Sequence, residues 1–303
     1  MADTIDKVYV NTYERTVRHL AQQGDQRLRN WVMETGAQSG SALNDSTGGH
    51  NWDRLQKCVA APKTTRKQAT ADQDMEWSRR KSIPRVTDVG TTTEHEDPSA
   101  MIIDPNSAIA HSQGMAMARA FDIEILRAAS AAAVDGVGDA VAYDAAQEIN
   151  GGDSATGVPF TFDLITEVSE KFMANDIDPS EPKVWVIGPA QARKMLQLTE
   201  ATNADYSALM PLQSKGYVDN FMGFTWVLSN LLEDSAAVPD GVASTTVAMT
   251  RKAIGFQVAQ DIWSRVEESV DYSFLWRIYS AANFGAVRVE DEHLVKIQTL
   301  NAI

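Results

Sequence analysis

The strongest pattern in the chain is a run of small and apolar residues at steps of three and four between residues 104 and 134. This spacing places them on one face of a helix. The positions are Ala110, Gly114, Met117, Phe121, Ile125, Ala128 and Ala132. Asp104-Pro105 is a good helix start, because the carboxylate can accept backbone amides and proline has no amide to leave unpaired. The pattern predicts a helix of about 30 residues that stops at Asp135-Gly136.

Small residues on the buried stripe would let another backbone approach this helix closely. Gly114 costs about 1 kcal/mol relative to alanine inside a helix, so we expect a close contact there that offsets the cost. Arg119 with Asp122, and Glu124 with Arg127, are opposite charges three residues apart and are expected to pair. The alternative is an ordinary core helix broken at Gly114.

Two segments before this helix have no apolar core of their own. Residues 8–33 carry a broken apolar face, which predicts a helix-forming arm, and turn-rich sequence follows to residue 51. Residues 52–97 lack helical periodicity, and extended pieces at 57–61 and 85–89 predict a long two-stranded hairpin. An isolated hairpin is marginal in water. Both segments are therefore expected to need the surface of another molecule.

The chain after the long helix mixes helical and extended patterns. An amphipathic helix is predicted at 161–174, a buried strand at 183–187, and a helix from Pro189 to Leu198. Strand-like segments follow at 224–229, 245–249, 254–258, 262–270 and 274–279, and 286–289 with 294–297 predicts a terminal strand pair. This order predicts an α+β fold.

Composition places the chain among ordinary globular proteins, with 44% hydrophobic and 22% charged residues over a length typical of about two domains. No stretch approaches the apolar length of a membrane span, and the N-terminus lacks an apolar signal region, so neither a membrane protein nor a secreted one is expected. Cys58 is the single cysteine, which excludes an intrachain disulfide and a zinc site built on several cysteines.

The net charge of −14 is unevenly distributed. Residues 54–85 contain nine basic and three acidic residues, whereas residues 86–303 contain 13 basic and 31 acidic ones. An acidic body is poorly suited to tight phosphate binding. A basic segment on an acidic body suggests contact between copies of the chain. A solvated basic loop is the alternative.

Sequence motifs for catalysis or cofactor binding are missing. The chain has no dinucleotide fingerprint, no Walker A pattern, no nucleophile elbow and no metal-binding spacing among its five histidines. The acidic run 94–97 is interpreted as an exposed loop in preference to a cation site. Trp77 beside Arg79 and Arg80 could stack on a nucleobase, but packing against a neighbouring subunit is preferred. No catalytic residue, cofactor or metal site is predicted.

Several short stretches carry a family resemblance. They are VWVIGP at 184–189, followed by the helix-forming 190–196, GFTWVLSN at 223–230, RKAIG at 251–255 and NTYER at 11–15. Their order and spacing resemble the major capsid proteins of tailed double-stranded DNA bacteriophages, which have the Hong Kong 97 fold. The resemblance covers nearly the whole chain.

That resemblance implies a division into five segments. They are an N-terminal arm at 1–51, an extended loop at 52–97, a peripheral domain with a spine helix at 98–149, an axial domain at 150–259, and a return to the peripheral domain at 260–303. Residues expected to contact other subunits are Arg66, Lys67, Trp77, Arg79, Arg80, Lys81, Tyr13 and Trp31.

The resemblance also implies a structural function without catalysis. The chain would form pentamers and hexamers in a closed shell around double-stranded DNA, without sequence-specific binding or a membrane. A separate scaffolding protein and a portal are implied, with assembly in the cytoplasm of the bacterial host and a final location in the virion capsid. The alternatives are an encapsulin-like nanocompartment shell and a soluble cytoplasmic enzyme of unrecognised type.

Overall fold

The computed structural model describes residues 22–36, 49–66, 69, 72–94, 105–150, 157–198, 219–232, 243–269 and 275–301. They fall into two compact units. The first takes residues 86–120 and 261–282 with the chain before residue 26, and the second takes residues 26–85, 121–260 and 283–303. Helix α2 and strands β12 and β13, whose bounds follow, contribute residues to both units. The five segments implied by the resemblance stay a prediction.

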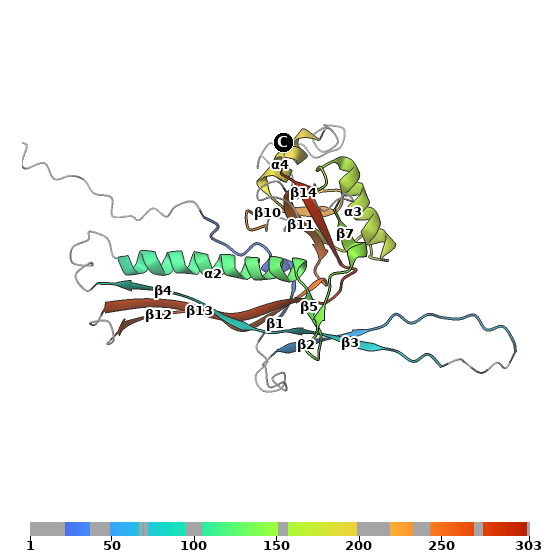
Figure 1. The fold of residues 1–303 in the computed structure, drawn as a ribbon, viewed down its shortest axis with the longest axis horizontal. Helices are drawn as coiled ribbons and strands as arrows, with labels where there is room; N and C mark the ends of the chain where they lie inside the picture. Colours follow the sequence, from blue (N-terminus) through green and yellow to red (C-terminus); the bar gives the residue numbers. More distant parts are fainter. Residues whose placement is uncertain are drawn as a thin grey trace, which may run out of the picture. The chain divides into compact units, whose positions relative to one another are not determined.

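The long predicted helix is present as α2 (Pro105–Ser130), drawn in green in Figure 1. Its predicted apolar stripe is buried at Met117, Phe121, Ile125 and Ala128. The predicted C-terminal end is wrong. The helix stops at Ser130, whose hydroxyl donates to the carbonyls of the preceding turn, and the next residues enter a short hairpin, β5 (Ala133–Val134) with β6 (Ala140–Val141). Asp135-Gly136 lies in the turn of that hairpin.

Two further expectations for α2 are corrected. Gly114 has no atom of the described chain within 4 Å of the position of a Cβ, so no close contact with the described residues accounts for it. Glu124 and Arg127 pair at 2.5 Å as predicted. Arg119 and Asp122, however, bind elsewhere. Arg119 donates to the side chain of Gln22 at 2.6 Å, and Asp122 accepts backbone amides that precede η2.

A four-stranded sheet has the order β1-β12-β13-β4. Its strands are β1 (Met33–Gly36), β12 (Ile254–Ser269), β13 (Leu275–Arg288) and β4 (Arg85–Thr93). In the first unit α2 covers one face of this sheet, because the Gln113 amide donates to Thr91 Oγ1 and to the carbonyl of Ile278, and accepts from Ser280. The sequence predicted four shorter strands here. In the structure 254–258 and 262–269 belong to β12, whereas 275–279 and 286–288 belong to β13.

A six-stranded sheet belongs to the second unit and has the order β7-β14-β11-β8-β10-β9. The strands are β7 (Glu148–Ile149), β14 (Leu294–Leu300), β11 (Ala243–Thr250), β8 (Lys183–Ile187), β10 (Phe224–Leu228) and β9 (Asn220–Phe221). The predicted terminal pairing of 286–289 with 294–297 is wrong, because β14 pairs with β11 and β7 instead of β13. A short 3₁₀ helix, η3 (Ala145–Gln147), precedes β7.

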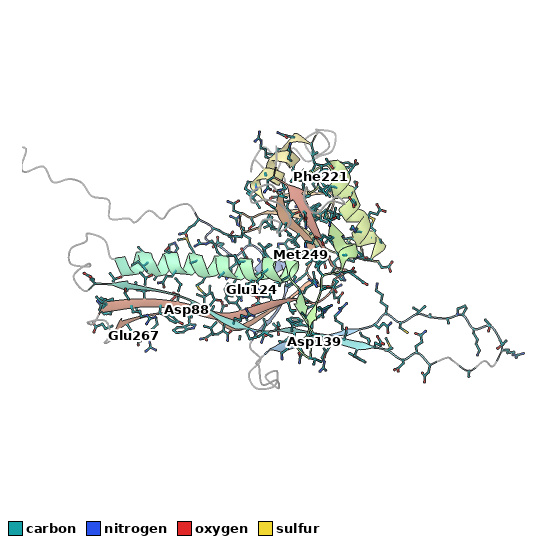
Figure 2. All side chains as sticks on the ribbon, in the orientation of Figure 1. Asp88, Glu124, Asp139, Phe221, Met249 and Glu267 are labelled. Carbon is teal, nitrogen blue, oxygen red and sulfur yellow. The ribbon has the colours of Figure 1, made fainter. Side chains whose placement is uncertain are left out.

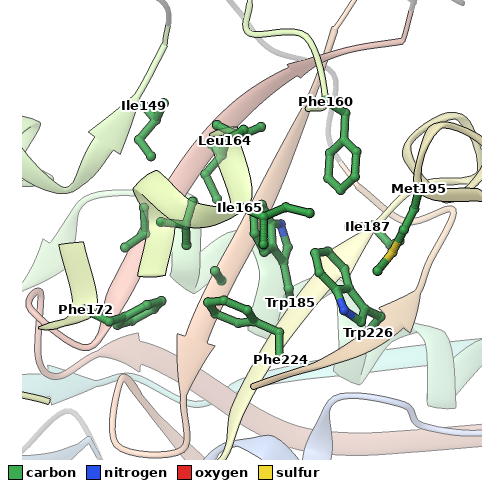
Figure 3. Close-up of a cluster of buried hydrophobic side chains, with 14 of the residues drawn as sticks. Ile149, Phe160, Leu164, Ile165, Phe172, Trp185, Ile187, Met195, Phe224 and Trp226 are labelled. Atoms are coloured by element: carbon green, nitrogen blue, oxygen red, sulfur yellow. The ribbon is translucent and has the colours of Figure 1, made fainter. Parts of the chain in front are cut away.

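Two helices pack on this sheet as the sequence predicted. α3 (Phe162–Ala174) is capped by the Thr161 hydroxyl and buries Leu164, Ile165, Val168 and Phe172. α4 (Pro189–Gln197) begins with proline at its first turn. Figure 3 shows the core between helices and sheet, where Trp185 and Trp226 lie side by side below Phe160. Every residue of β8 is buried, as the apolar run predicted.

The predicted hairpin is present but uses other residues. It consists of β2 (His50–Leu55) and β3 (Trp77–Ser82), which pair antiparallel and run side by side in Figure 1. Residues 57–61 lie outside any strand, and 85–89 belong to β4. The predicted helical arm is wrong for residues 22–33, which contain only the 3₁₀ helix η2 (Arg29–Trp31) before β1. The arm before residue 22 lies outside the described residues.

Candidate subunit-contact surfaces

The β2–β3 hairpin carries most of the residues that the sequence singled out for subunit contact. Its register places Asp53 opposite Arg79 and Leu55 opposite Trp77. Asp53 and Arg79 form an ion pair of 2.5 Å, and more than half of the Arg79 side chain remains exposed. An exposed pair of this kind contributes about 0–1 kcal/mol, so it favours the strand register without fixing it.

The last cross-strand pair of the hairpin is apolar and exposed. Trp77 is 71% exposed and Leu55, directly opposite, is 49% exposed, with Val59 beyond them at 69%. We call Leu55, Val59 and Trp77 the hairpin patch. A tryptophan buries a large apolar area when it is covered, and such residues dominate protein–protein contacts. Nothing in the described part of the subunit covers this patch.

Beyond the ladder, the two sides of the loop remain linked by the backbone bond from Gln56 to Glu76 and by the side chain of Gln73. The Gln73 amide donates to the carbonyl of Val59 at 2.6 Å and accepts from its backbone N–H at 3.3 Å, as a strand neighbour would. The Cys58 thiol also donates to Gln73. Arg66 is exposed further along the loop. Lys67, another predicted contact residue, lies outside the described residues.

Arg80 and Lys81 are positioned differently from their neighbour Arg79. They are 6% and 7% exposed, because strand β3 turns them into the second unit. The sequence predicted that 79–81 form one protruding basic cluster. In the structure only Arg79 of the three protrudes, because the strand is exposed up to Arg79 and its last residues, at the root of the hairpin, are covered by the chain itself. Contact of Arg80 and Lys81 with another subunit stays a prediction, but because both side chains are buried they are not part of the surface proposed below.

The buried guanidinium of Arg80 shares a carboxylate with Arg288. Arg80 Nη2 lies 3.0 Å from Asp291 Oδ2, and Arg288 Nε donates to the other oxygen of Asp291. Arg288 is fully buried, donates to the carbonyls of Ala131 and Ala142, and lies over the ring of Tyr143 at 4.6 Å. Burial lowers the pKa of Arg80 and raises that of Tyr143. One carboxylate therefore anchors the hairpin root to the end of β13.

The turn after β13 has a role that its sequence does not indicate. From the sequence alone, the acidic run Glu290, Asp291 and Glu292 suggests a solvated face or a subunit contact. Instead Glu290 lies 3.2 Å from His293 Nε2, Asp291 binds both arginines, and Glu292 lies 3.2 Å from Lys57 of the basic loop. The available signal was three consecutive acids following an arginine in a chain whose basic residues concentrate at 54–85.

The backbone just before β1, near the candidate contact residue Trp31, is fixed by a buried carboxylate. Asp122 is 1% exposed and accepts the backbone amides of Arg27 at 3.0 Å and Leu28 at 3.2 Å. Trp31, in η2, is partly buried within the subunit. Tyr13 lies outside the described residues. Asp122 therefore fixes the backbone at Arg27 and Leu28 within the second unit.

The first unit presents an open groove on the sheet face opposite α2. Its volume is about 450 Å³, and it is lined by Asp88, Trp263, Arg265, Glu267, Arg277 and Tyr279. Figure 2 labels Asp88 and Glu267 on this sheet. Trp263 and Tyr279 contact edge to face at 5.4 Å. The groove mixes aromatic and charged groups and resembles an interaction surface more than a reaction site.

Among the described residues, no group of three or more histidine, cysteine or acidic side chains is placed to hold a metal ion. No helix in the described ranges is long and apolar enough to span a membrane.

Comparison with known proteins decides the family. The model of the family described as phage capsid protein matches residues 5–301. The chain belongs to the phage capsid protein family. A search of curated protein sequences finds no match.

Solved capsid structures share the fold over nearly their whole length. The cyanophage Pam1 capsid aligns with a TM-score of 0.73 at 12% identity, over 99% of this chain and 98% of that one. The capsid of cyanophage P-SCSP1u aligns at 0.69 and 14% identity, over 100% and 96%. The mature capsid of bacteriophage PhiM1 aligns at 0.68 and 17% identity, over 98% and 93%.

These findings confirm the resemblance and the α+β fold of the Hong Kong 97 type. The protein is a major capsid subunit of a multi-subunit shell and is located in the virion capsid. The encapsulin-like alternative is not favoured, and membership of a structural capsid family implies a non-enzymatic role.

Proposed function

We propose that this phage capsid protein builds a closed icosahedral shell of pentamers and hexamers around double-stranded DNA. The observation that carries the proposal is the β2–β3 hairpin, which extends an exposed apolar patch away from any core of its own. Apolar area contributes about 25 cal/mol per Å² when buried, before the costs of association. A patch that repeats on every subunit would stabilise many equivalent contacts.

Electrostatics supports contact between subunits in preference to specific DNA binding. The exposed basic residues Arg66 and Arg79, with Lys67, belong to the segment of positive charge, while the rest of the chain is acidic. Each exposed ion pair is weak, and screening at physiological salt acts over about 8 Å. Several weak contacts per subunit favour closure while single wrong contacts can still dissociate.

The proposal includes partners and a place of assembly. A separate scaffolding protein would guide closure, a portal would admit the genome, and assembly would take place in the bacterial cytoplasm. The support is the family membership and the resemblance set out above. DNA would be enclosed without sequence-specific contacts, in keeping with the acidic body of the subunit.

The test is co-expression with the scaffolding protein of the same phage, followed by electron microscopy and light scattering. Closed particles of uniform size are expected, and a monodisperse monomer would overturn the proposal. Trp77→Ala should reduce particle yield while the subunit melts like the parent. Met173→Ala, which also truncates an exposed apolar side chain (57% exposed), is the matched control and should assemble normally.

A second experiment separates the roles of the basic loop. Reversing Arg66 and Arg79 to glutamate should hinder closure even in the absence of DNA, because it places acid against an acidic neighbour. Normal empty shells that fail only to retain a genome would instead assign the loop to DNA.

A further inference from the structure

A small cavity lies at the root of the hairpin and is lined by basic and apolar residues only. Its volume is about 70 Å³, enough for a small polar group or a few water molecules. The basic lining consists of Lys81, Arg85, Arg127 and Arg288. The apolar lining consists of Ile83, Ala128, Ala132, Val134, Ala286 and Val287. Within the described ranges, no carboxylate lines this cavity.

Arg127 and Arg288 each bind a carboxylate that lies outside the cavity. Arg127 binds Glu124 at 2.5 Å, and Arg288 binds Asp291 and two backbone carbonyls. Asp291 also binds Arg80, so the group of Arg80, Arg288 and Asp291 keeps one net positive charge.

Arg85 is different. It is exposed, and its side chain makes neither an ion pair nor a hydrogen bond with any other described residue. The positive charge that remains on the group of Arg80, Arg288 and Asp291 is buried, where its field is screened less. The cavity therefore combines unbalanced positive charge with a guanidinium available for two parallel hydrogen bonds, the geometry that best fits an oxyanion.

We propose that this cavity receives a carboxylate side chain from a second copy of the chain, with Arg85 as the residue that binds it. The inference rests on the proposed function, since shell closure brings copies together. Charge complementarity supports this occupant, because residues 86–303 carry 31 acidic against 13 basic residues. Shape supports it as well. The apolar walls suit the methylene groups of an aspartate or glutamate, whereas a DNA backbone would set sugar and phosphate oxygens against them.

Charge reversal tests the site. Arg85→Glu should reduce the yield of closed particles about tenfold at low salt, since like charges would meet across the contact. The unassembled variant should melt like the parent, because the side chain is exposed. Arg193→Glu is the matched control, as Arg193 is an exposed arginine of α4 without an ion pair in the described chain. If Arg85→Glu forms particles as well as the parent and the control do, the inference is wrong. Failure of the parent to form particles would instead overturn the proposed function.

A chemical test identifies the occupant. Particles are assembled from equal amounts of normal and heavy-nitrogen Arg85→Lys subunits and treated with a carbodiimide, which joins amines to touching carboxylates. Cross-linked peptides that combine the two labels are expected at position 85. Links only within one label, or no link at position 85, would overturn the proposal. So would Arg85→Glu shells that form normally and fail only to retain DNA, since the ligand would then be a genome phosphate.

Discussion

Trp185 and Trp226 stack on each other across the neighbouring parallel strands β8 and β10, with ring centroids 4.8 Å apart and ring planes inclined by 22°. Both rings are at most 3% exposed, and both indole N–H groups are buried without a hydrogen-bond partner in the described chain. The stack therefore acts through packing and not through polar contacts.

Replacing Trp185 with alanine should lower the free energy of unfolding by about 3–5 kcal/mol, because a large buried ring would leave a cavity. Trp185→Phe should cost less, since it keeps an aromatic ring and removes an unpaired donor. Urea unfolding followed by circular dichroism measures both. Trp77→Ala is the control, because Trp77 is exposed and its loss should leave subunit stability nearly unchanged. A Trp185→Ala subunit as stable as the parent would contradict the packing described here.

Asp291→Asn should destabilise the subunit by about 3–5 kcal/mol, because two buried guanidinium groups would lose their shared counter-charge. Glu292→Gln removes the exposed pair with Lys57 and should cost at most about 1 kcal/mol. Thermal or urea unfolding of the two variants at neutral pH compares them directly. Equal effects would mean that the buried network does not anchor the hairpin root.

Acid should remove the stabilising effect of Glu290. Its pKa lies below the ordinary value of 4.5, chiefly because it accepts a hydrogen bond from His293, with smaller effects of nearby positive charges. A carboxylate with a lowered folded-state pKa stabilises the protein above pH 4.5, and the effect is lost as the pH falls through the folded-state pKa. The parent should therefore exceed Glu290→Gln in stability at about pH 7, and the difference should shrink toward about pH 3. A difference that is independent of pH would contradict this assignment.

Two glycine substitutions should act in opposite directions. Gly114→Ala should stabilise the subunit by about 0.5–1 kcal/mol, because the new methyl group meets no described atom and alanine favours the helix. Gly285→Ala should destabilise it, because the Cβ would lie 2.4 Å from the carbonyl oxygen of Ile83, a backbone atom that cannot move alone. Melting temperatures measure both. A destabilised Gly114→Ala subunit would indicate a contact with the part of the chain outside the described residues.

The sequence predicted elements well where one face is buried by the chain itself. The apolar run of β8, the amphipathic α3 and the Gly-Pro start of α4 are local signals, and the structure has each of them within a residue or two. The stripe of α2 is equally local. Its end was missed because the carbonyl of Ala131 is taken by Arg288, which is distant in sequence.

Contacts between segments that are distant in the chain could not be predicted from the sequence. The sequence predicted 254–258 and 262–270 as separate segments, whereas β12 is continuous, because pairing within the sheet maintains its mostly exposed outer half. Arg80 is buried together with Asp291, which is distant in the sequence. The sequence of the basic loop alone therefore gives no sign that one of its arginines is buried. The basic residues around Trp77 pointed to it as a contact residue, and its side chain is exposed. That Leu55 lies opposite Trp77 follows only from the strand register.

The sharing of Asp291 by Arg80 and Arg288 has an evolutionary consequence. A single replacement that removes the carboxylate at position 291 leaves two buried cations without their counter-charge, and the loss of one arginine changes the charge balance of the other. Replacements that change these charges are therefore best tolerated when positions 80, 288 and 291 change together. Aligned homologues should therefore show these three positions substituting as a linked set, whereas the solvent-exposed Asp53 and Arg79 should drift independently of them.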